Sequence, residues 1–460
     1  MQKIIFKVIL VGFLALMLLI PLSMIQEVVS DRQNYRYEAM EQIAASWTDH
    51  QNMIGPVLVL PYKERVLLKN WDADKKKLIE QTKVYQRYTY VNPSKLDIQA
   101  NIETEERYIG IYKFPVYHSK IAIDGNFEIT KRYGISQNVD IVSFGKPYLV
   151  IGVNDKRGMT KIPILHWNET EQVFYPGANT DLVRNGIHSI LPKVDTSMDH
   201  NMSFRFHVNL QGMSSFEIVP IGKSNKVSIV SSWPHPSFIG RFPPKNRKIS
   251  QEGFQAQWEV SHFATRVSEY FTENNTKLFN ELLGETVGVR LIEPVDIYLK
   301  AERSVKYGIL FIGLTFTFFF LFEVLKKLKI HPVQYGLVGI ALALFFLLLV
   351  SLSEHIAFAL AYSIASIVSI ALLSFYISGI LKSWLVGMGF GMFLGMIYGV
   401  LYILLQSEDH ALLMGSALLF TVLAVIMIVT RKINWYEAGD TLSFKIKNPF
   451  VSMTHNDVSS

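Results

Sequence analysis

The sequence predicts a multi-pass α-helical membrane protein with six transmembrane helices and a large β-rich extracytoplasmic domain inserted between helices 1 and 2. Composition gives the first reason, since half of the 460 residues are hydrophobic and only 18% are charged. The second reason is that uncharged apolar runs, each near the roughly 20 residues that cross a hydrocarbon core, cluster at the two ends of the chain. The third is that the interval between them alternates like β-strands.

The first apolar run extends from Val8 to about Val29 and follows Lys3 and Lys7. A cleaved signal peptide is the alternative, because it also has a basic start and an apolar centre. This run is longer than such a centre, and no small-x-small cleavage pattern precedes the charged residues that follow. Residues 1–30 are therefore predicted to form an uncleaved transmembrane anchor.

Five further spans are expected at about 305–325, 332–350, 356–380, 384–405 and 411–430. They would form a five-helix bundle over residues 305–432, followed by a tail at 433–460. Lysine and arginine lie in alternate loops, whereas the loops SLSEH (351–355) and QSEDH (406–410) contain neither. Because basic short loops stay in the cytoplasm, we expect both termini and the tail to be cytoplasmic and residues 31–304 to lie outside.

The pattern of residues 31–304 is mostly of period two. Strands are predicted at 83–91, 107–123 with a break at Pro115, 148–153, 202–210 and 225–232. In MSFRFHVNL (202–210) every second residue is apolar, which predicts a sheet with one buried face. Asp124-Gly125-Asn126 is read as a turn, and helices are expected near 31–48 and 264–283. Whether this region forms one domain or two is left open.

Several kinds of chemistry have no support in the sequence. The chain has no cysteine, so disulfides, thiol catalysis and thiolate metal sites are excluded. No Gly-x-Ser-x-Gly nucleophile motif occurs, and the histidines have no metal-ligand spacing. The net charge of +6 partly reflects the basic cytoplasmic loops and does not indicate nucleic-acid binding. We expect no catalytic residue, no metal and no cofactor.

The stretch SSWPHPSFIG (231–240) contains Trp233 and places His235 between two prolines. Each proline fixes its own φ and pushes the preceding residue toward extended geometry, so a stiff corner at the end of a strand is expected. A docking surface for a partner and a chemical site are the alternatives.

Two patterns in the membrane half concern packing and charge. Gly387, Gly391, Gly395 and Gly399 recur every four residues, which predicts close helix packing, within the chain or in a dimer; the oligomeric state stays open. Glu323 is the one carboxylate within a predicted span. Lys326 and Lys327, three and four residues later, favour a local ion pair over a transport path.

The two outer loops repeat an acid followed by a histidine. The residues are Glu354 and His355 in one loop and Glu408 and His410 in the other. Helix capping is one interpretation. The hypothesis we retain is a pH-sensitive contact surface between the bundle and the β-rich domain.

Six ordered segments closely resemble the bacterial CreD family of inner-membrane proteins. They are SSWPHPSFIG, GFQAQWEVSHFA (253–264), KYGILFIGLTFTFFFLFEVL (306–325), HPVQYGLVGIALALFFLLLVSLSEHIAF (331–358), ALLMGSALLF (411–420) and RKINWY (431–436). The resemblance implies a bacterial inner membrane location and a link to cell-envelope integrity and envelope stress. It supplies no catalytic or binding residues.

Two classes of function remain. The first is a non-enzymatic envelope protein whose exported domain binds a cell-wall component or a protein partner, while the helices sit in the lipid bilayer. The alternative is a transporter or envelope enzyme that handles a lipid-linked or wall-derived substrate. A transporter is expected to place charges at mid-membrane depth, and an enzyme to cluster histidines and carboxylates. The sequence shows neither pattern, which favours the first class.

Overall fold

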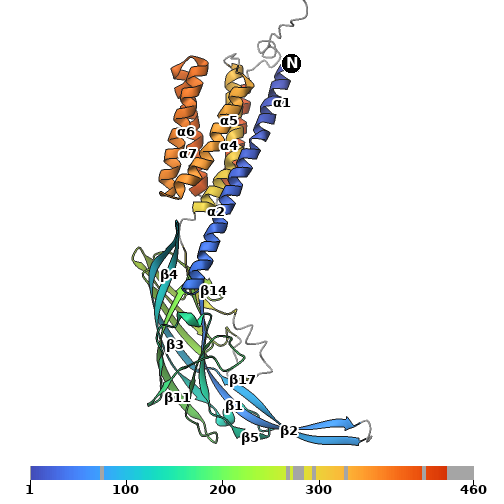
Figure 1. The fold of residues 1–460 in the computed structure, drawn as a ribbon, viewed down its shortest axis with the longest axis vertical. Coiled ribbons are helices and arrows are strands. Elements are labelled where there is room, and N and C mark those ends of the chain that lie inside the picture. Colours follow the sequence, from blue (N-terminus) through green and yellow to red (C-terminus); the bar gives the residue numbers. More distant parts are fainter. Residues whose placement is uncertain are drawn as a thin grey trace, which may run out of the picture. The chain divides into compact units, whose positions relative to one another are not determined.

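A computed structural model describes residues 2–72, 77–265, 270–272, 284–292, 297–325, 330–406 and 411–431. The chain divides into two compact units, one of residues 37–294 and one of residues 1–36 together with 295–460. The predicted fold class is confirmed: an apolar N-terminal helix precedes a large β-rich unit, and further apolar helices follow it (Figure 1). Each unit is described by itself.

The N-terminal helix has two segments, α1 (Gln2–Met17) and α2 (Leu19–Ser46). The interruption at Leu18 lies one turn before Pro21, which has no N–H to donate to the preceding turn. Regular bonding resumes directly, since the Leu22 N–H donates to the Leu18 carbonyl at 3.3 Å. The predicted helical extension beyond the first span is confirmed, because α2 continues to Ser46.

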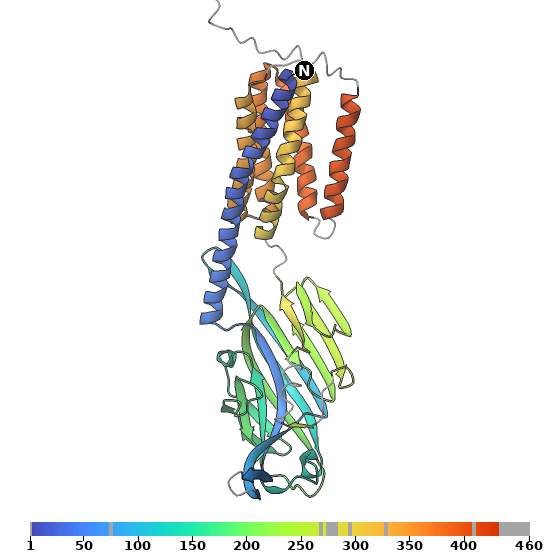
Figure 2. The ribbon, with the colours of Figure 1, turned by 90° about the vertical axis from the view of Figure 1, so that its right-hand side faces the viewer.

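The remaining helices of this unit are α4 (Ile297–Leu325), α5 (Pro332–Ser353), α6 (Phe358–Leu381), α7 (Trp384–Gln406) and α8 (Ala411–Thr430). By length and composition, the N-terminal helix and α4 to α7 are able to cross a membrane, whereas the apolar part of α8 within the described residues is shorter. Figure 2 shows α4 to α7 packed side by side. Their common core is aromatic: Phe311, Phe345 and Tyr398 contact one another with ring centroids 4.6–6.4 Å apart.

The β-rich unit consists of two sheets. The ten-stranded sheet contains β1 (Gln51–Asp72), β2 (Lys77–Val91), β5 (Ile141–Phe144), β6 (Tyr148–Val153), β9 (Tyr175–Pro176), β10 (Gly186–Ile190), β12 (Ser215–Val219), β14 (Pro236–Gly240), β17 (Tyr270–Thr272) and β18 (Val287–Leu291). The eight-stranded sheet contains β3 (Lys95–Ile109), β4 (Tyr112–Ile129), β7 (Ile164–Trp167), β8 (Thr170–Val173), β11 (His200–Met213), β13 (Ser224–Ser231), β15 (Asn246–Ser250) and β16 (Gly253–Ser261).

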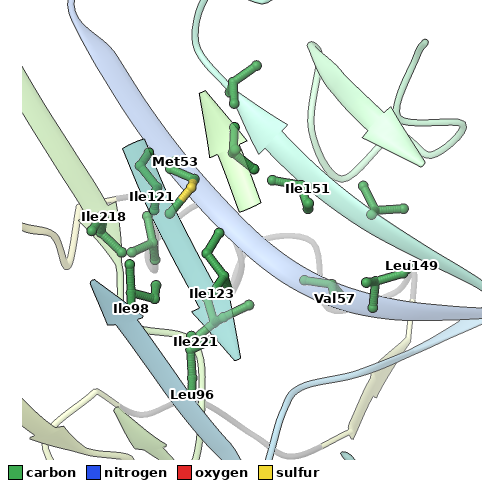
Figure 3. Close-up of a cluster of buried hydrophobic side chains, with 14 of the residues drawn as sticks. Met53, Val57, Leu96, Ile98, Ile121, Ile123, Leu149, Ile151, Ile218 and Ile221 are labelled. Atoms are coloured by element: carbon green, nitrogen blue, oxygen red, sulfur yellow. The ribbon is translucent and has the colours of Figure 1, made fainter. Parts of the chain in front are cut away.

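The two sheets share one hydrophobic core. Met53 and Ile151 from the ten-stranded sheet lie near Ile98 and Ile123 from the eight-stranded sheet, and all four are fully buried (Figure 3). The alternation in β11 is the predicted one, since Phe204 and its alternate neighbours are buried while Arg205 is exposed. The two sheets therefore form one sandwich around this core, and a separate small cluster contains Ala39, Ile43, Phe114, Val116 and Met213.

Two predicted breaks are wrong. Asp124-Gly125-Asn126 is not a turn but lies inside β4, where Gly125 permits close packing: a Cβ there would lie 2.0 Å from the Lys95 carbonyl oxygen. The break expected at Pro115 is instead at Gly110, whose φ of 57° suits the turn between β3 and β4. β4 continues through Pro115 because its regular pairing with β11 ends at Val116, where no N–H is needed from the next residue, and the Pro115 carbonyl still accepts from the Ser214 N–H at 3.2 Å.

The helix expected near 264–283 is wrong where the structure describes it. Tyr270–Thr272 form β17, which pairs with β2, residues 264 and 265 are not helical, and the rest of that prediction lies outside the described residues. Long-range contacts explain the strand. The Tyr270 hydroxyl accepts from Thr130 N and donates to the Glu128 carbonyl, each at 2.9 Å, and these contacts outweigh a local helical preference.

Strand direction places the start of β1 and the end of β18 at the same end of the ten-stranded sheet. Gln51, the first residue of β1, pairs with Phe216 of β12, and Phe216 pairs in turn with Val289 of β18. The last turn of α2 precedes β1, and its Ala44 and Ala45 carbonyls accept hydrogen bonds from the Arg157 guanidinium. Burial opposes the ionised form of Asp155, but hydrogen bonds from Arg157 lower the pKa of that carboxyl below its usual range.

Candidate functional site

The eight-stranded sheet has a hollow on its outer face, which we call the sheet groove. Its volume is about 600 Å³. It is lined by Lys95, Asp124, Gly125, Asn126, His166, Asn168, Ser203, Phe204 and Arg205. The lining comes from β3, β4, β11 and the β7–β8 hairpin.

Strand register brings the charged residues of the sheet groove together. Arg205 of β11 pairs with Asp124 of β4 on one side and with His166 of β7 on the other. Residues that face each other across strands have Cβ atoms about 5 Å apart, so the three side chains form a short row. They point away from the core because Phe204 and Phe206, one residue to either side of Arg205, are buried in it.

Two cations of the sheet groove have no anionic partner. Within the described parts of the chain, neither Lys95 nor Arg205 has a carboxylate at ion-pair distance, and both are exposed. His166 differs, since its Nδ1 lies 3.5 Å from the Glu171 carboxylate. Unpaired exposed cations in a concave surface attract anions. The arrangement is therefore suited to an anionic ligand.

Hydrogen bonds fix the rim of the groove. Asn168 adopts a left-handed conformation (φ 49°) in the β7–β8 turn. Its Oδ1 accepts from the backbone N–H of Ser203 at 2.7 Å and from the Ser203 hydroxyl at 3.1 Å. On the other side, the Asn126 amide donates to Asn201 Oδ1 at 3.0 Å. The side chains of Asn168, Ser203 and Asn126 are thus held in place before any ligand arrives.

The proline corner connects the two sheets, because it lies between β13 of one and β14 of the other. The half-buried Trp233 packs against the core, and its indole N–H donates to the Ile292 carbonyl at 3.0 Å. The carbonyl of His235 accepts from the Ile292 N–H at 3.1 Å, while the imidazole is exposed. The corner therefore holds Ile292, the residue that follows β18, through two hydrogen bonds.

Of the four outer-loop residues, the structure describes two. Glu354 ends α5, and its carboxylate lies 3.2 Å from Arg32 Nε of α2 and 3.5 Å from the Tyr298 hydroxyl of α4. His355 is exposed, whereas Glu408 and His410 lie outside the described residues. The structure thus gives Glu354 partners in its own unit, and the contact surface between bundle and domain stays a prediction.

The glycine series of α7 is not uniform. A Cβ at Gly387 would lie 1.7 Å from the Ser378 hydroxyl of α6, and one at Gly391 would lie 2.3 Å from the Ser374 hydroxyl. At Gly395 the nearest atom is 3.8 Å away, and at Gly399 nothing lies within 4 Å. The first two glycines therefore permit the close contact between α6 and α7, and the last two do not contribute to it.

A buried ion pair joins α1 to α4 and α5. Glu323 is fully buried and pairs with Lys7 of α1, 316 residues away in sequence. The carboxylate also accepts from the Tyr335 hydroxyl at 2.9 Å and from the Ile330 N–H at 3.0 Å. Lys7 donates further to the Ile330 carbonyl at 3.0 Å, so every group in the cluster has a partner.

Sequence reasoning missed both the sheet groove and the partner of Glu323. The local partners expected for Glu323, Lys326 and Lys327, lie outside the described residues. The available signal was charge: Lys7 lies in one apolar segment and Glu323 in another, and opposite charges in such segments are expected to pair. The groove residues gave no local signal, because strands distant in sequence bring them together.

Comparison with known proteins identifies the family. A family model described as inner membrane protein CreD matches residues 3–436. The inner membrane protein CreD of Escherichia coli (strain K12) is 36% identical over 421 residues, which cover 92% of this chain and 91% of that protein. The chain belongs to the CreD family. It is accordingly a multi-pass inner membrane protein, embedded in lipid through its apolar helices.

Solved structures add little to CreD family membership. An M1 zinc metallopeptidase from Deinococcus radiodurans is 6% identical, with 37% of this chain and 38% of that chain aligned at a TM-score of 0.19. A similarity this low does not indicate a shared fold. Within the described residues, no group of three or more His, Asp or Glu side chains is placed to hold a metal ion.

The proline corner of this CreD family member gives a test with a built-in control. Trp233→Phe keeps an aromatic ring but removes the indole donor to the Ile292 carbonyl, so we expect the free energy of unfolding to fall by about 0.5–1.5 kcal/mol. His235→Ala removes only an exposed ring and is expected to change it by less than about 0.5 kcal/mol. Denaturant titration of the purified protein measures both. An equal loss in the two variants contradicts the assignment.

The buried ion pair predicts strong coupling. Lys7→Met strands the Glu323 carboxylate in an apolar environment and is expected to cost about 3–5 kcal/mol of stability. Lys7→Met combined with Glu323→Gln should cost less than the sum of the single changes, measured by denaturant titration in detergent. Lys306→Gln is the control, since Lys306 is exposed and its ion pair with the half-buried Glu302 is expected to contribute about 1 kcal/mol or less. Additive losses contradict the coupling.

Proposed function

We propose that this protein is a non-enzymatic component of the inner membrane that serves cell-envelope integrity under stress. In this proposal the β-rich unit lies on the extracytoplasmic side, binds an anionic component of the cell wall through the sheet groove, and is anchored by the helices. Both termini are cytoplasmic. Membership of the CreD family supports the membrane context, and the finer role is our own inference.

The charge distribution supports the orientation. Lys3 and Lys7 lie at the N-terminal end of α1, Lys382 lies between α6 and α7, and Arg431 and Lys432 follow α8. The two loops at the opposite helix ends, residues 351–355 and residues 406–410, contain no lysine or arginine. Basic residues in short loops are retained in the cytoplasm, so this pattern favours an exported β-rich unit.

The single observation that carries the binding proposal is the pair of unpaired cations in a preformed polar groove. Lys95 and Arg205 supply positive charge, while His166, Asn126 and the Ser203 hydroxyl line the same hollow and add hydrogen-bonding groups. Cell-wall glycan strands and their peptides present carboxylates among many hydroxyls and amides, which matches this set of donors and acceptors. Asp124 adds an acceptor for a ligand hydroxyl or amide.

The groove favours binding over catalysis. Among the described residues, Asp124 is the one carboxylate that lines it, so it lacks the pair of carboxylates that hydrolysis of a glycan requires, and the Ser203 hydroxyl donates to Asn168 and not to a general base. His166 already lies beside Glu171 at the β7–β8 hairpin. We therefore propose a recognition role for the groove and assign no reaction to it.

Reporter fusions test the orientation. Fusions after Thr160 and Glu354 are expected to report the extracytoplasmic side, and fusions after Lys382 and Asp440 the cytoplasm, because of the loop charges. Paired alkaline phosphatase and fluorescent reporters in intact cells measure this. A cytoplasmic signal at Thr160 would overturn the orientation and, with it, the access of the groove to the cell wall.

Sedimentation with insoluble cell-wall sacculi tests the binding. Full-length protein in detergent is mixed with purified sacculi, and the bound fraction is measured at low and moderate salt. We expect Lys95→Gln with Arg205→Gln to weaken binding about tenfold or more, since two charge-assisted contacts are lost. The wild-type protein should also release as salt rises.

Arg247→Gln with Lys248→Gln is the matched control. It removes the same two charges from β15, an exposed edge strand of the same sheet, and should leave sacculus binding near the wild-type level. An equal loss in both double variants would mean that general positive charge, not the groove, binds sacculi. Absence of wild-type binding would exclude the cell wall as the ligand.

A further inference from the structure

The connection between α6 and α7 contains a second open hollow, which we call the loop groove. Its volume is about 580 Å³, and its wall includes Phe375, Ser378, Gly379, Lys382, Ser383 and Trp384. It lies at an end of two membrane-spanning helices, where the apolar interior gives way to polar headgroups. Nothing in the sheet groove or the ion pair involves these residues.

Backbone geometry gives the loop groove its form. Lys382 ends α6 in the left-handed conformation (φ 50°) and donates its N–H to the Ser378 carbonyl. α7 begins two residues later, so the connection is tight. Gly387 packs closely against Ser378, whereas a Cβ at Gly379 would meet no atom within 4 Å. The space beside Gly379 is therefore open.

The polar part of the loop groove contains an available cation. Lys382 is exposed, and among the described residues it has no carboxylate at ion-pair distance. The half-buried Ser383 lies directly beside it. Trp384, which is 66% exposed, follows at the start of α7. Exposed tryptophan beside lysine at a helix end is typical of the membrane–water interface.

The apolar part of the loop groove continues along the helices. Phe375, Leu372 and Val368 are exposed at i, i−3 and i−7 on α6, and so lie on one face. Leu385, Met388 and Met392 form a similar exposed line on α7. In a membrane-embedded bundle these lines face acyl chains. A ligand of the groove thus meets a cation at one end and hydrocarbon-compatible surface beyond it.

We propose that the loop groove binds the headgroup of an anionic phospholipid. The phosphate lies beside Lys382 and the Ser383 hydroxyl, and an acyl chain follows the exposed line of α6 from Phe375 toward Val368. Charge complementarity selects an anionic over a zwitterionic lipid, and the apolar line selects a lipid over a free phosphate. A juxtamembrane lysine contributes about fivefold to the binding of an anionic lipid.

Native mass spectrometry of the full-length protein in detergent tests the proposal. The protein is titrated with phosphatidylglycerol and, separately, with phosphatidylcholine of the same chain length. We expect Lys382→Asn to weaken phosphatidylglycerol binding about fivefold and to leave phosphatidylcholine binding unchanged. Asparagine tolerates the left-handed conformation at this position, so the fold is retained. Lys382→Arg keeps the charge and should bind phosphatidylglycerol as tightly as the wild-type protein does.

Two further measurements separate the alternatives. Lys306→Gln removes a lysine of α4 that is already paired with Glu302, and should leave phosphatidylglycerol binding unchanged. Inorganic phosphate at millimolar concentration should not displace the bound lipid, whereas a short-chain phosphatidylglycerol should bind more weakly than the long-chain form. Equal losses in Lys382→Asn and Lys306→Gln, or displacement by phosphate alone, would overturn the proposal.

Discussion

A domain inserted between two membrane helices must receive the chain and return it at the same end, and the rest of the β-rich unit depends on this constraint. The ten-stranded sheet meets it through β12, which lies between β1, where the sandwich begins, and β18, where its described part ends. Gln51 and Val289 both align with Phe216, so two strand spacings of about 5 Å separate them. Parallel pairing of β1 with β12 makes this possible, because β12 lies some 160 residues later and starts at the same end.

At that end of the sheet, the start of β1 and the end of β18 are secured by side-chain hydrogen bonds to backbone, not by a tight local turn. Gln51 is fully buried, and its amide donates to the Asp155 and Gln211 carbonyls, while Arg157 holds the last turn of α2. On the exit side Trp233 donates to Ile292. A stiff proline corner is useful there because a rigid extended segment places the indole without a further loss of conformational entropy. The conspicuous composition of residues 231–240 thus has a structural explanation.

Local patterns predicted the elements of this protein well and their partners poorly. Apolar length located the membrane helices, and alternation located β11 with its buried face, because both signals lie within one segment. The turn predicted at Gly125 is wrong because the close approach of Gly125 to the Lys95 carbonyl depends on a strand 30 residues away. Tyr270 was misread as helical for the same reason. The sheet groove and the Lys7–Glu323 pair both arise from long-range register, which composition and periodicity do not encode.

Charge pairing separates the groups that hold this fold together from those available to ligands. Lys7 and Glu323 are buried and fully partnered, so a ligand would have to break several hydrogen bonds to reach them, at a cost that exposed pairs do not impose. Lys95, Arg205 and Lys382 are exposed, have no carboxylate at ion-pair distance among the described residues, and line hollows with neighbouring hydroxyls or amides. An anion can approach such a cation without breaking an existing ion pair. Recognition in this protein is therefore expected at its unpaired cations, and stability at its paired ones.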